Sequence, residues 1–478
     1  MNYRMILNIL GWVLKFEAAV MLLPLSCSII YMEKTAICFV ICILICFLFG
    51  MLLTKIKLKT KTMFSKEGFT TVALSWIVIS IFGALPFVIS SSIPNFVDAL
   101  FETVSGFTTT GASILSDVES LPKGILFWRS FTHWIGGMGV LVFLVAILPL
   151  SGGNNVYLLK AESPGPSVSK LVPKIRGTAK ILYSIYSVMT LVEIIILLFG
   201  GMDLFEAMTI SFGTAGTGGF AVRNSSLADY SSFIQNTVTT FMILFGVNFS
   251  LYYLILVKKF KEAFQSEEFR TYILIIVVAT LMICLNSYPL FDDLGNALKH
   301  SAFQVASIMT TTGFATDDFN RWPEFSKGIL VILMMIGACA GSTGGGIKVS
   351  RLIIALKTVA KELILTAHPK STRKITLDRR VVEHETIRSI NVFIMAYAFI
   401  FVVSTLIIAI DDFNFTTNFT AVAATINNIG PGLEAVGPVE NFNGFSYLSK
   451  VVLTFDMLIG RLEIFPMLML FSPYTWKK

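Results

Sequence analysis

Four short stretches of the chain end in the same small residues, mostly threonine followed by glycine, and this composition could bind a dehydrated cation. The stretches end Thr108-Thr109-Thr110-Gly111, Gly216-Thr217-Gly218-Gly219, Thr310-Thr311-Thr312-Gly313 and Asn427-Asn428-Ile429-Gly430. Glycine adopts positive φ without steric cost, so an extended segment that contains it can aim successive carbonyl oxygens in one direction. Four such segments around one axis would make rings of oxygens that replace the hydration shell of a monovalent cation.

The residue types in these stretches favour a site made of carbonyl oxygens. No charged residue occurs in the last two turns before any of the four glycines, whereas Ca²⁺ and Mg²⁺ sites typically need carboxylates. The C-terminal ends of preceding half-helices would add partial negative charge. The alternative is that these glycines only allow membrane helices to pack closely. The predicted cation ligands are Thr109, Thr110, Gly111, Thr217, Gly218, Gly219, Thr311, Thr312, Gly313, Asn428, Ile429 and Gly430.

The composition indicates what must position these ligands. Of the 478 residues 55% are apolar and only 14% are charged, and the mean hydropathy is +0.76. Soluble domains carry about 25% charged residues, so the chain has too little polar surface to coat a soluble globule. The sequence therefore predicts an all-α integral membrane protein and excludes a disordered, fibrous or secreted disulfide-rich class. It contains no nucleophile–base motif, HExxH, Walker A or dinucleotide fingerprint, so we expect no enzyme, no catalytic residues and no organic cofactor.

A helix needs about 20 mostly apolar residues to cross a bilayer, and ten segments qualify. They are 5–31, 36–54, 69–91, 124–149, 178–199, 233–257, 271–290, 327–357, 388–410 and 447–472. The four Thr- and Gly-ending segments are too short to cross and return; they are 95–113, 203–221, 296–315 and 415–432. The order of a span, a short segment and a second span thus recurs four times. The residue six positions before each of the four glycines is always small; these residues are Ser105, Gly213, Ser307 and Ala424.

This periodicity predicts four pseudo-symmetric helix–pore-loop–helix repeats around one central pore, preceded by two extra transmembrane helices. The expected units are two N-terminal helices (1–66), repeat 1 (67–160), repeat 2 (161–268), repeat 3 (269–358), a cytoplasmic loop (359–386) and repeat 4 (387–478).

The charges predict the orientation. Of the 37 basic residues, 26 lie on loops of one side or at the C-terminus, and the positive-inside rule makes that side cytoplasmic, with both termini there. Ten acids lie on the opposite loops, at Asp117, Glu119, Asp229, Asp292, Asp293, Asp317, Asp318, Asp411, Asp412 and Glu440. They are either ordinary solvated loop residues or a vestibule that concentrates cations.

Two features near the expected pore could control it. Glycines interrupt the span 327–357, because helices tolerate glycine poorly; the result is either a kink or a gating loop over 337–347. Arg461 lies within the last span, where a charge is costly and commonly functional. It could pair with Glu463 or lie beneath the filter as a positive barrier. The predicted gating residues are Gly341, Gly344, Gly345, Gly346, Lys348 and Arg461.

Together these motifs resemble the Trk/Ktr/HKT superfamily of potassium transporters. Thr109-Thr110-Gly111, the stretch 212–220, Thr311-Thr312-Gly313 and the stretch 428–432 look like its four pore loops, and the stretches 341–348 and 460–466 look like two further motifs of its bacterial branch. The two extra N-terminal helices favour the TrkH type. The resemblance covers essentially the whole chain.

The resemblance implies a potassium uptake subunit of the cytoplasmic membrane, with K⁺ as the transported ion. It implies a homodimer, surrounded by lipid and controlled by a cytosolic ring of nucleotide-binding (RCK-type) subunits, and a loop that plugs the pore below the filter. Glycine at the key position of all four pore loops accompanies K⁺ selectivity in the superfamily, whereas serine in the first accompanies Na⁺ transport. The fourth loop, with Asn428 and Ile429, departs most from the pattern, so the pore is only pseudo-fourfold.

The sequence also bears on two other functions, coupled transport and nucleic-acid binding. A K⁺ symporter coupled to H⁺ or Na⁺ would need a titratable group on the ion path, which the filter segments do not supply. The basic loop 359–386 lacks the aromatic interleaving and the fold signatures of nucleic-acid binding. We therefore expect a protein partner there and no nucleic acid.

Overall fold

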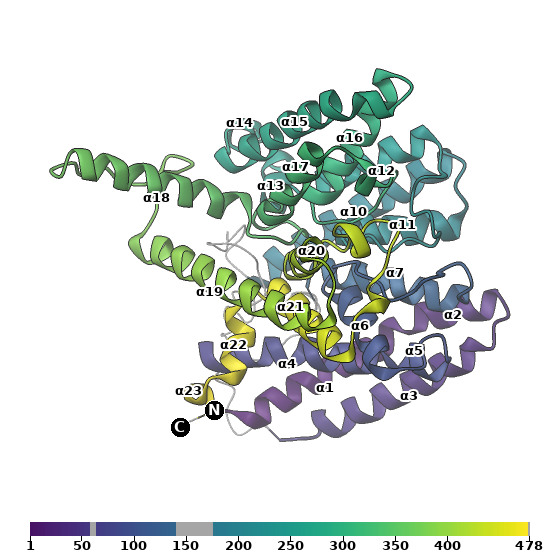
Figure 1. Ribbon diagram of the computed structural model, residues 1–478. Coiled ribbons are helices and arrows are strands. Elements are labelled where there is room, and N and C mark those ends of the chain that lie inside the picture. The colour runs from purple at the N-terminus through teal and green to yellow at the C-terminus, as the bar shows by residue number, and fades with distance from the viewer. Residues whose placement is uncertain (58–63, 140–174, 477–478) are drawn as a thin grey trace.

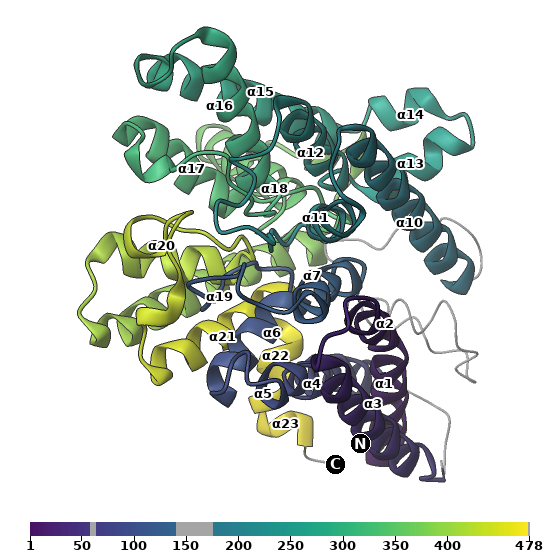
Figure 2. The same cartoon turned by 90° about the vertical axis from the view of Figure 1, so that its right-hand side faces the viewer.

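The computed structural model describes residues 1–57, 64–139 and 175–476. They form four helical repeats and two preceding helical spans (Figures 1 and 2), which confirms the predicted fold class. Three predicted features lie outside the described residues. They are the second half of the expected span 124–149, the boundary between repeats 1 and 2 at 160/161, and the basic residues at 160–174 and 477–478.

The N-terminal part contains two antiparallel spans. The first joins α1 (Tyr3–Val20) to α2 (Leu22–Ile30), and the second is α3 (Thr35–Thr54). Gly11 and Gly50 face each other at their crossing, where a methyl group on Gly11 would lie 2.9 Å from the carbonyl oxygen of Gly50. Small residues at such a crossing let membrane helices approach closely.

Each repeat consists of a first span, a half-helix and a second span. Repeat 1 contains α4 (Ser65–Gly83) with α5 (Leu85–Ile89), α6 (Phe96–Phe107) and α7 (Lys123–Gly137). Repeat 2 contains α10 (Ile175–Phe199), α11 (Leu204–Gly216) and α12 (Ser232–Phe245) with α13 (Phe249–Leu256) and α14 (Phe260–Phe264). Repeat 3 contains α15 (Glu267–Ser287), α16 (Leu294–Met309), α17 (Glu324–Ile336) and α18 (Val349–Ala367). Repeat 4 contains α19 (His384–Ile408), α20 (Phe415–Ile426) and α21 (Tyr447–Arg461) with α22 (Phe465–Phe471) and α23 (Pro473–Trp476).

The remaining elements are short. A two-stranded antiparallel hairpin, β1 (Thr376–Leu377) and β2 (Arg380–Val381), lies between α18 and α19. The 3₁₀ turns are η1 (Tyr288–Leu290), η2 (Phe319–Arg321), η3 (Ala409–Asp411), η4 (Glu434–Val436) and η5 (Phe442–Gly444). The helix α18 projects from the body of the molecule (Figure 1).

The four half-helices begin in the same way because each follows an Asn or Asp that caps it. The side-chain oxygens of Asn95, Asp203, Asp293 and Asn414 accept hydrogen bonds from backbone N–H groups in the first turns of α6, α11, α16 and α20. Such a cap satisfies donors that a helix start leaves unpaired, at a gain of about 1 kcal/mol. The four starts are therefore fixed locally, and their C-terminal ends point at a common site.

The second spans are less regular than the sequence predicts. Among the described residues, six helices are long and apolar enough to cross a membrane, and α12 with α13 makes a seventh only as a pair bent by 91°. The expectation of continuous spans over 233–257 and 447–472 is therefore wrong. The bend after α12 follows Gly246. The break after α21 places Glu463 and Ile464 at positive φ, and α22 then begins with Pro466 in its first turn, where a helix tolerates the missing N–H.

The two termini lie together. The Tyr3 ring stacks on Trp476 with a centroid distance of 6.3 Å, and the Lys66 ammonium donates to the carbonyl oxygen of Tyr474 at 3.3 Å. Both views place N and C next to each other (Figures 1 and 2). Tyr3 and Trp476 are thus on one side of the helical bundle; that this side is cytoplasmic stays a prediction.

Candidate functional site

The four half-helices end in one recurring turn. We name the residues that follow them segment 1 (108–111), segment 2 (216–219), segment 3 (310–313) and segment 4 (427–430). In each, the residue before the glycine donates its N–H to the small residue six positions before that glycine, at 2.8 Å; the pairs are Thr110 to Ser105, Gly218 to Gly213, Thr312 to Ser307 and Ile429 to Ala424. This is the 6→1 bond of a Schellman-type helix end.

The backbone of the four segments follows one pattern of dihedral angles. Thr109, Thr217, Thr311 and Asn428 have φ between 55° and 59°, and Gly111, Gly219, Gly313 and Gly430 have φ between 76° and 101°. Left-handed backbone costs an L-residue roughly 1–2 kcal/mol, and helices usually place glycine at this position. The fold therefore accepts strain at three threonines and one asparagine, which indicates that these side chains have a use there.

The four segments close into a ring. A methyl group on Gly111 would overlap the carbonyl oxygen of Gly218 in segment 2. In the same way Gly219 abuts Thr312 in segment 3, Gly313 abuts Ile429 in segment 4, and a methyl group on Gly430 would lie 2.8 Å from the carbonyl oxygen of Thr110 in segment 1. Each glycine thus touches the carbonyl of the next segment, and the fourth returns to the first. The structure brings together all twelve residues that the sequence predicts as cation ligands.

Side chains hold the segments from outside the ring. The hydroxyls of Thr108 and Thr110 lie 2.8 Å apart, and those of Thr310 and Thr312 lie 2.7 Å apart. The Asn428 amide donates to the Thr110 hydroxyl at 2.9 Å, which ties segment 4 to segment 1. The residues preceding the glycines are buried, whereas Gly111, Gly219 and Gly313 are half-buried. The backbone oxygens are thus held rigidly while three of the glycines remain accessible.

A loop of glycines lies against the segments. It replaces the middle of the eighth expected span, since α17 ends at Ile336 and α18 begins at Val349, and we call it the glycine loop (337–348). Its Gly345 N–H donates to the Thr311 hydroxyl at 2.6 Å, and a methyl group on Gly344 would lie 2.8 Å from the carbonyl oxygen of Thr310. The Lys348 ammonium donates to the carbonyl oxygen of Gly344 within the loop. The interruption is therefore a folded loop packed on segment 3, and not a kink.

Arg461 joins the glycine loop to segment 1. Its guanidinium donates to the Thr343 carbonyl at 2.9 Å and to the Thr109 hydroxyl at 3.2 Å. It also donates to the carbonyl oxygens of Gly136 and Gly137, where α7 ends, at 2.5 and 2.7 Å. The carboxylate of Glu463 forms an ion pair with Arg351 at the start of α18. Of the two roles open for Arg461, the geometry favours a cation placed beside the segments.

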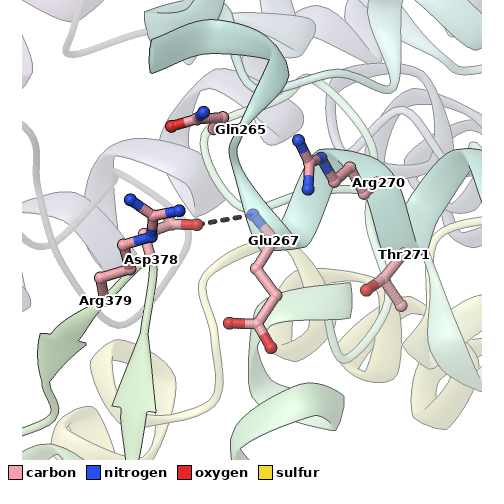
Figure 3. Close-up of a pocket in the computed structure, with 6 residues that line it drawn as sticks. All are labelled: Gln265, Glu267, Arg270, Thr271, Asp378 and Arg379. Atoms are coloured by element: carbon pink, nitrogen blue, oxygen red, sulfur yellow. Dashed lines mark hydrogen bonds between the residues drawn. The ribbon is translucent and has the colours of Figure 1, made fainter. Parts of the chain in front are cut away.

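Glu268, in the first turn of α15, holds both ends of the glycine loop. Its Oε1 accepts the N–H of Ala340 at 2.7 Å and that of Ser350 at 3.1 Å. The preceding Glu267 donates its N–H to Asp378 in the β1–β2 turn at 2.6 Å, a contact that Figure 3 shows at the edge of a pocket of about 340 Å³. The loop is thus linked through α15 to the hairpin between α18 and α19.

A buried ion pair within repeat 1 reaches into repeat 2 through a further hydrogen bond of its arginine. Arg129 on α7 donates to Glu102 on α6 at 2.6 Å, and both side chains are buried. Glu102 also accepts the N–H of Ile114, and Arg129 donates to the carbonyl oxygen of Ala221 at 2.9 Å. The pair therefore anchors the chain just after segments 1 and 2.

Several of the acids on the outer loops have structural partners. Asp117 accepts the Asn224 amide at 2.8 Å, and this hydrogen bond lowers the pKa of the Asp117 carboxyl below its ordinary value. Asp293 caps α16, and Asp411 accepts the Ser446 N–H at 2.8 Å. These contacts give a structural reason for individual acids; whether the group also concentrates cations stays a prediction.

With this geometry in place, comparison with known families is decisive. A family model described as TrkH, cation transport protein, matches residues 35–478. The chain belongs to the TrkH family. Members of the family are membrane transporters and not enzymes, so the family inferred from the motifs is confirmed.

Relatives of this TrkH-family chain match it from end to end. The Trk system potassium uptake protein TrkH of Escherichia coli K12 is 37% identical over 491 residues, and that of Vibrio parahaemolyticus is 35% identical over 487; each match covers 100% of both chains. The crystal structure of the potassium transporter TrkH from Vibrio parahaemolyticus superposes with a TM-score of 0.90 at 33% identity, with 100% of both chains covered.

The structure adds residues to the site that are not among the predicted cation ligands or gating residues. Thr343 binds Arg461 through its backbone carbonyl, an interaction that side-chain chemistry cannot reveal. Glu268 reads in the sequence as an ordinary acid at the start of a span. A clue existed for Glu102 and Arg129, since both fall within expected apolar segments, where charges are commonly paired.

Proposed function

We propose that this chain conducts K⁺ into the cell across the cytoplasmic membrane through a filter formed by segments 1 to 4. The observation that carries the proposal is the closed ring, in which each segment's glycine abuts a carbonyl of the next. The ligands are the twelve backbone and side-chain positions at 109–111, 217–219, 311–313 and 428–430. The relatives named as potassium uptake proteins support K⁺ as the ion.

The chemistry of a carbonyl ring suits K⁺. Backbone oxygens substitute for water around a weakly hydrated monovalent ion, and no carboxylate is needed. Three half-buried glycines leave room for the ion to enter. The hydroxyl pairs of Thr108 with Thr110 and Thr310 with Thr312 keep the oxygens from collapsing onto a smaller ion. K⁺ is the cargo, and we propose no organic cofactor in this chain.

We propose further that the glycine loop is the gate. It lies directly against Thr310 and Thr311 of segment 3, and Arg461 places a positive charge beside Thr109. Both features would oppose passage of a cation until the loop moves. The gating set is Gly341, Gly344, Gly345, Gly346, Lys348 and Arg461.

The cellular setting follows from family and charge. We propose a homodimer in the cytoplasmic membrane with both termini cytoplasmic, regulated by a cytosolic ring of RCK-type nucleotide-binding subunits. The basic loop 359–386 and its hairpin are the surface available to such a ring, and Glu267 and Glu268 connect that hairpin to the gate.

Purified protein in liposomes tests the proposal. A reversal potential that follows the K⁺ gradient alone, and is insensitive to a pH or Na⁺ gradient, is expected for a passive pore. A reversal potential that shifts with either gradient would instead support coupled symport. Rubidium density bound away from segments 1 to 4 would overturn the site.

A further inference from the structure

Segment 2 differs from the other segments at two positions that support the ring. Segments 1 and 3 have threonine at the positions one and three residues before the key glycine, and segment 4 has Ile429 and Asn427 there. Segment 2 has Gly218 and Gly216. It therefore lacks the hydroxyl pair that braces segments 1 and 3, and glycine backbone is the most costly to order.

His133 on α7 lies against both glycines of segment 2, with its ring against Gly218 and its backbone against Gly216. A methyl group on Gly218 would overlap the imidazole ring, and one on Gly216 would overlap the backbone carbonyl of His133. The imidazole is fully buried. Gly218 is therefore required by the imidazole, whereas Gly216 is required by the close approach of the α7 backbone. The imidazole fills the volume beside Gly218 that a side chain would otherwise take.

Hydrogen bonds fix the histidine between two repeats. Its Nε2 accepts the N–H of Phe220, the residue after the key glycine, at 3.2 Å. Its Nδ1 lies 2.7 Å from the carbonyl oxygen of Gly106 on α6. Because Nε2 accepts, the neutral ring carries its proton on Nδ1 and donates it to Gly106.

Phe220 is held from both sides. The centroids of the His133 and Phe220 rings lie 4.2 Å apart. The guanidinium of Arg129, which is also on α7, lies 3.5 Å from the centroid of the Phe220 ring. Two residues of repeat 1, Arg129 and His133, thus contact Phe220 directly after segment 2. They are four positions apart and lie on one face of α7.

We propose that His133 is a positioning residue that stands in for the side chains missing from segment 2 and so sets the K⁺ over Na⁺ selectivity of the ring. A buried histidine could merely complete the core, but this one bonds a backbone carbonyl just before segment 1 and the backbone N–H just after segment 2, which lacks the hydroxyl pair of segments 1 and 3. The inference rests on the proposed filter.

Substitutions at 133 separate volume from hydrogen bonding. Glutamine offers one donor and one acceptor, as the neutral imidazole does, whereas leucine offers volume alone. In liposomes, His133→Leu should lower the K⁺/Na⁺ permeability ratio by roughly five- to tenfold, the scale of a lost hydrogen bond. His133→Gln should keep the ratio within about twofold of the parent. Equal ratios for the leucine, glutamine and parent proteins would overturn the proposal.

A double substitution tests the direct contact. Gly218→Ala alone should reduce folded yield and selectivity because its methyl group meets the imidazole. In a His133→Ala background the same change should do less harm, since the ring is gone. If Gly218→Ala harms both backgrounds equally, His133 does not fill the space of the missing side chains.

A matched histidine provides the control. His300 on α16 stacks on Phe291 and bonds the Thr316 side chain, three residues beyond segment 3, and it bonds no backbone group of the ring. His300→Ala should therefore leave the permeability ratio unchanged. Failure of the inference is distinguishable from failure of the filter. If Gly219→Ser alters selectivity while His133→Leu does not, the proposed filter is supported and the proposed role of His133 is contradicted. If neither does, the filter itself is misplaced.

Discussion

The Arg461 guanidinium donates to the backbone carbonyl oxygen of Thr343 at 2.9 Å. This contact crosses from the last span to the glycine loop, and the same guanidinium reaches Thr109 of segment 1. A cation fixed here opposes a second cation, because Coulomb repulsion at a few ångströms is strong where water is scarce. It also holds the loop in place. In the proposed gate, Arg461 would both repel the transported cation and hold the glycine loop in place.

Replacing Arg461 by glutamine should raise ion flux through the transporter. The change removes the charge while leaving an amide that can still donate to the Thr343 carbonyl. We expect rubidium uptake into liposomes, normalised to folded protein, to rise severalfold. The Arg223→Gln variant is the control, because Arg223 forms a half-buried ion pair with Glu206 on the loop after segment 2; its uptake should not change. Unchanged uptake in the Arg461 variant would leave Arg461 a purely structural role.

Serine at the ring glycines should reduce selectivity in a graded way. At Gly111, Gly219 and Gly313 the new side chain overlaps the carbonyl of the next segment, whereas at Gly430 the nearest carbonyl would be 2.8 Å away. We expect serine at Gly111, Gly219 or Gly313 to lower the K⁺/Na⁺ permeability ratio by about tenfold or more, and serine at Gly430 to lower it less. A tenfold change corresponds to about 1.4 kcal/mol in the relative stabilisation of the two ions.

Gly201 is the matched control for backbone strain. It has φ of 86°, like the ring glycines, but a methyl group there would meet no atom within 4 Å. Gly201→Ser should therefore lower stability slightly and leave selectivity intact. A selectivity loss at Gly201 equal to that at Gly219 would show that strain, and not the ring contact, causes the effect.

The sequence predicts the repeat architecture and the ring because both depend on local patterns that recur. An apolar half-helix ends four times in a small residue and a glycine six positions later, and each copy folds into the same turn. Recurrence of this kind distinguishes the segments from isolated Thr-Gly turns.

The breaks in the second spans could not be predicted in the same way. Hydropathy over 233–257 is continuous, but the chain bends after Gly246, whose added methyl group would meet Thr310 and Tyr272. The bend therefore results from packing against repeat 3, which is remote in sequence. His133, Glu268 and Thr343 escape prediction for the same reason, since their partners lie 27 to 118 residues away.

Loss of the Glu268 carboxylate should loosen the glycine loop. Glu268→Ala leaves the N–H groups of Ala340 and Ser350 without their acceptor, and an unsatisfied buried donor costs about 1–3 kcal/mol. We expect faster hydrogen exchange in peptides that contain these two amides, together with higher rubidium flux. Glu267→Ala is the neighbouring control, because its carboxylate pairs with Lys357 near the surface, where an ion pair contributes about 0–1 kcal/mol. Identical exchange in the two variants would remove Glu268 from the gate.

Breaking the Glu102–Arg129 pair should destabilise the protein more than breaking an exposed pair. Both side chains are buried, so removing one partner leaves an uncompensated charge, at a cost of about 3–5 kcal/mol. We expect Glu102→Gln to lower the thermal midpoint in detergent by several degrees, with recovery in the Glu102→Gln/Arg129→Gln double variant, which buries no net charge. Glu262→Gln breaks the exposed ion pair between Glu262 and Lys259, whose side chains are 59% and 55% exposed respectively. This change should shift the thermal midpoint little. Equal shifts for the buried and exposed pairs would show that Glu102 and Arg129 do not anchor the chain beyond the ring.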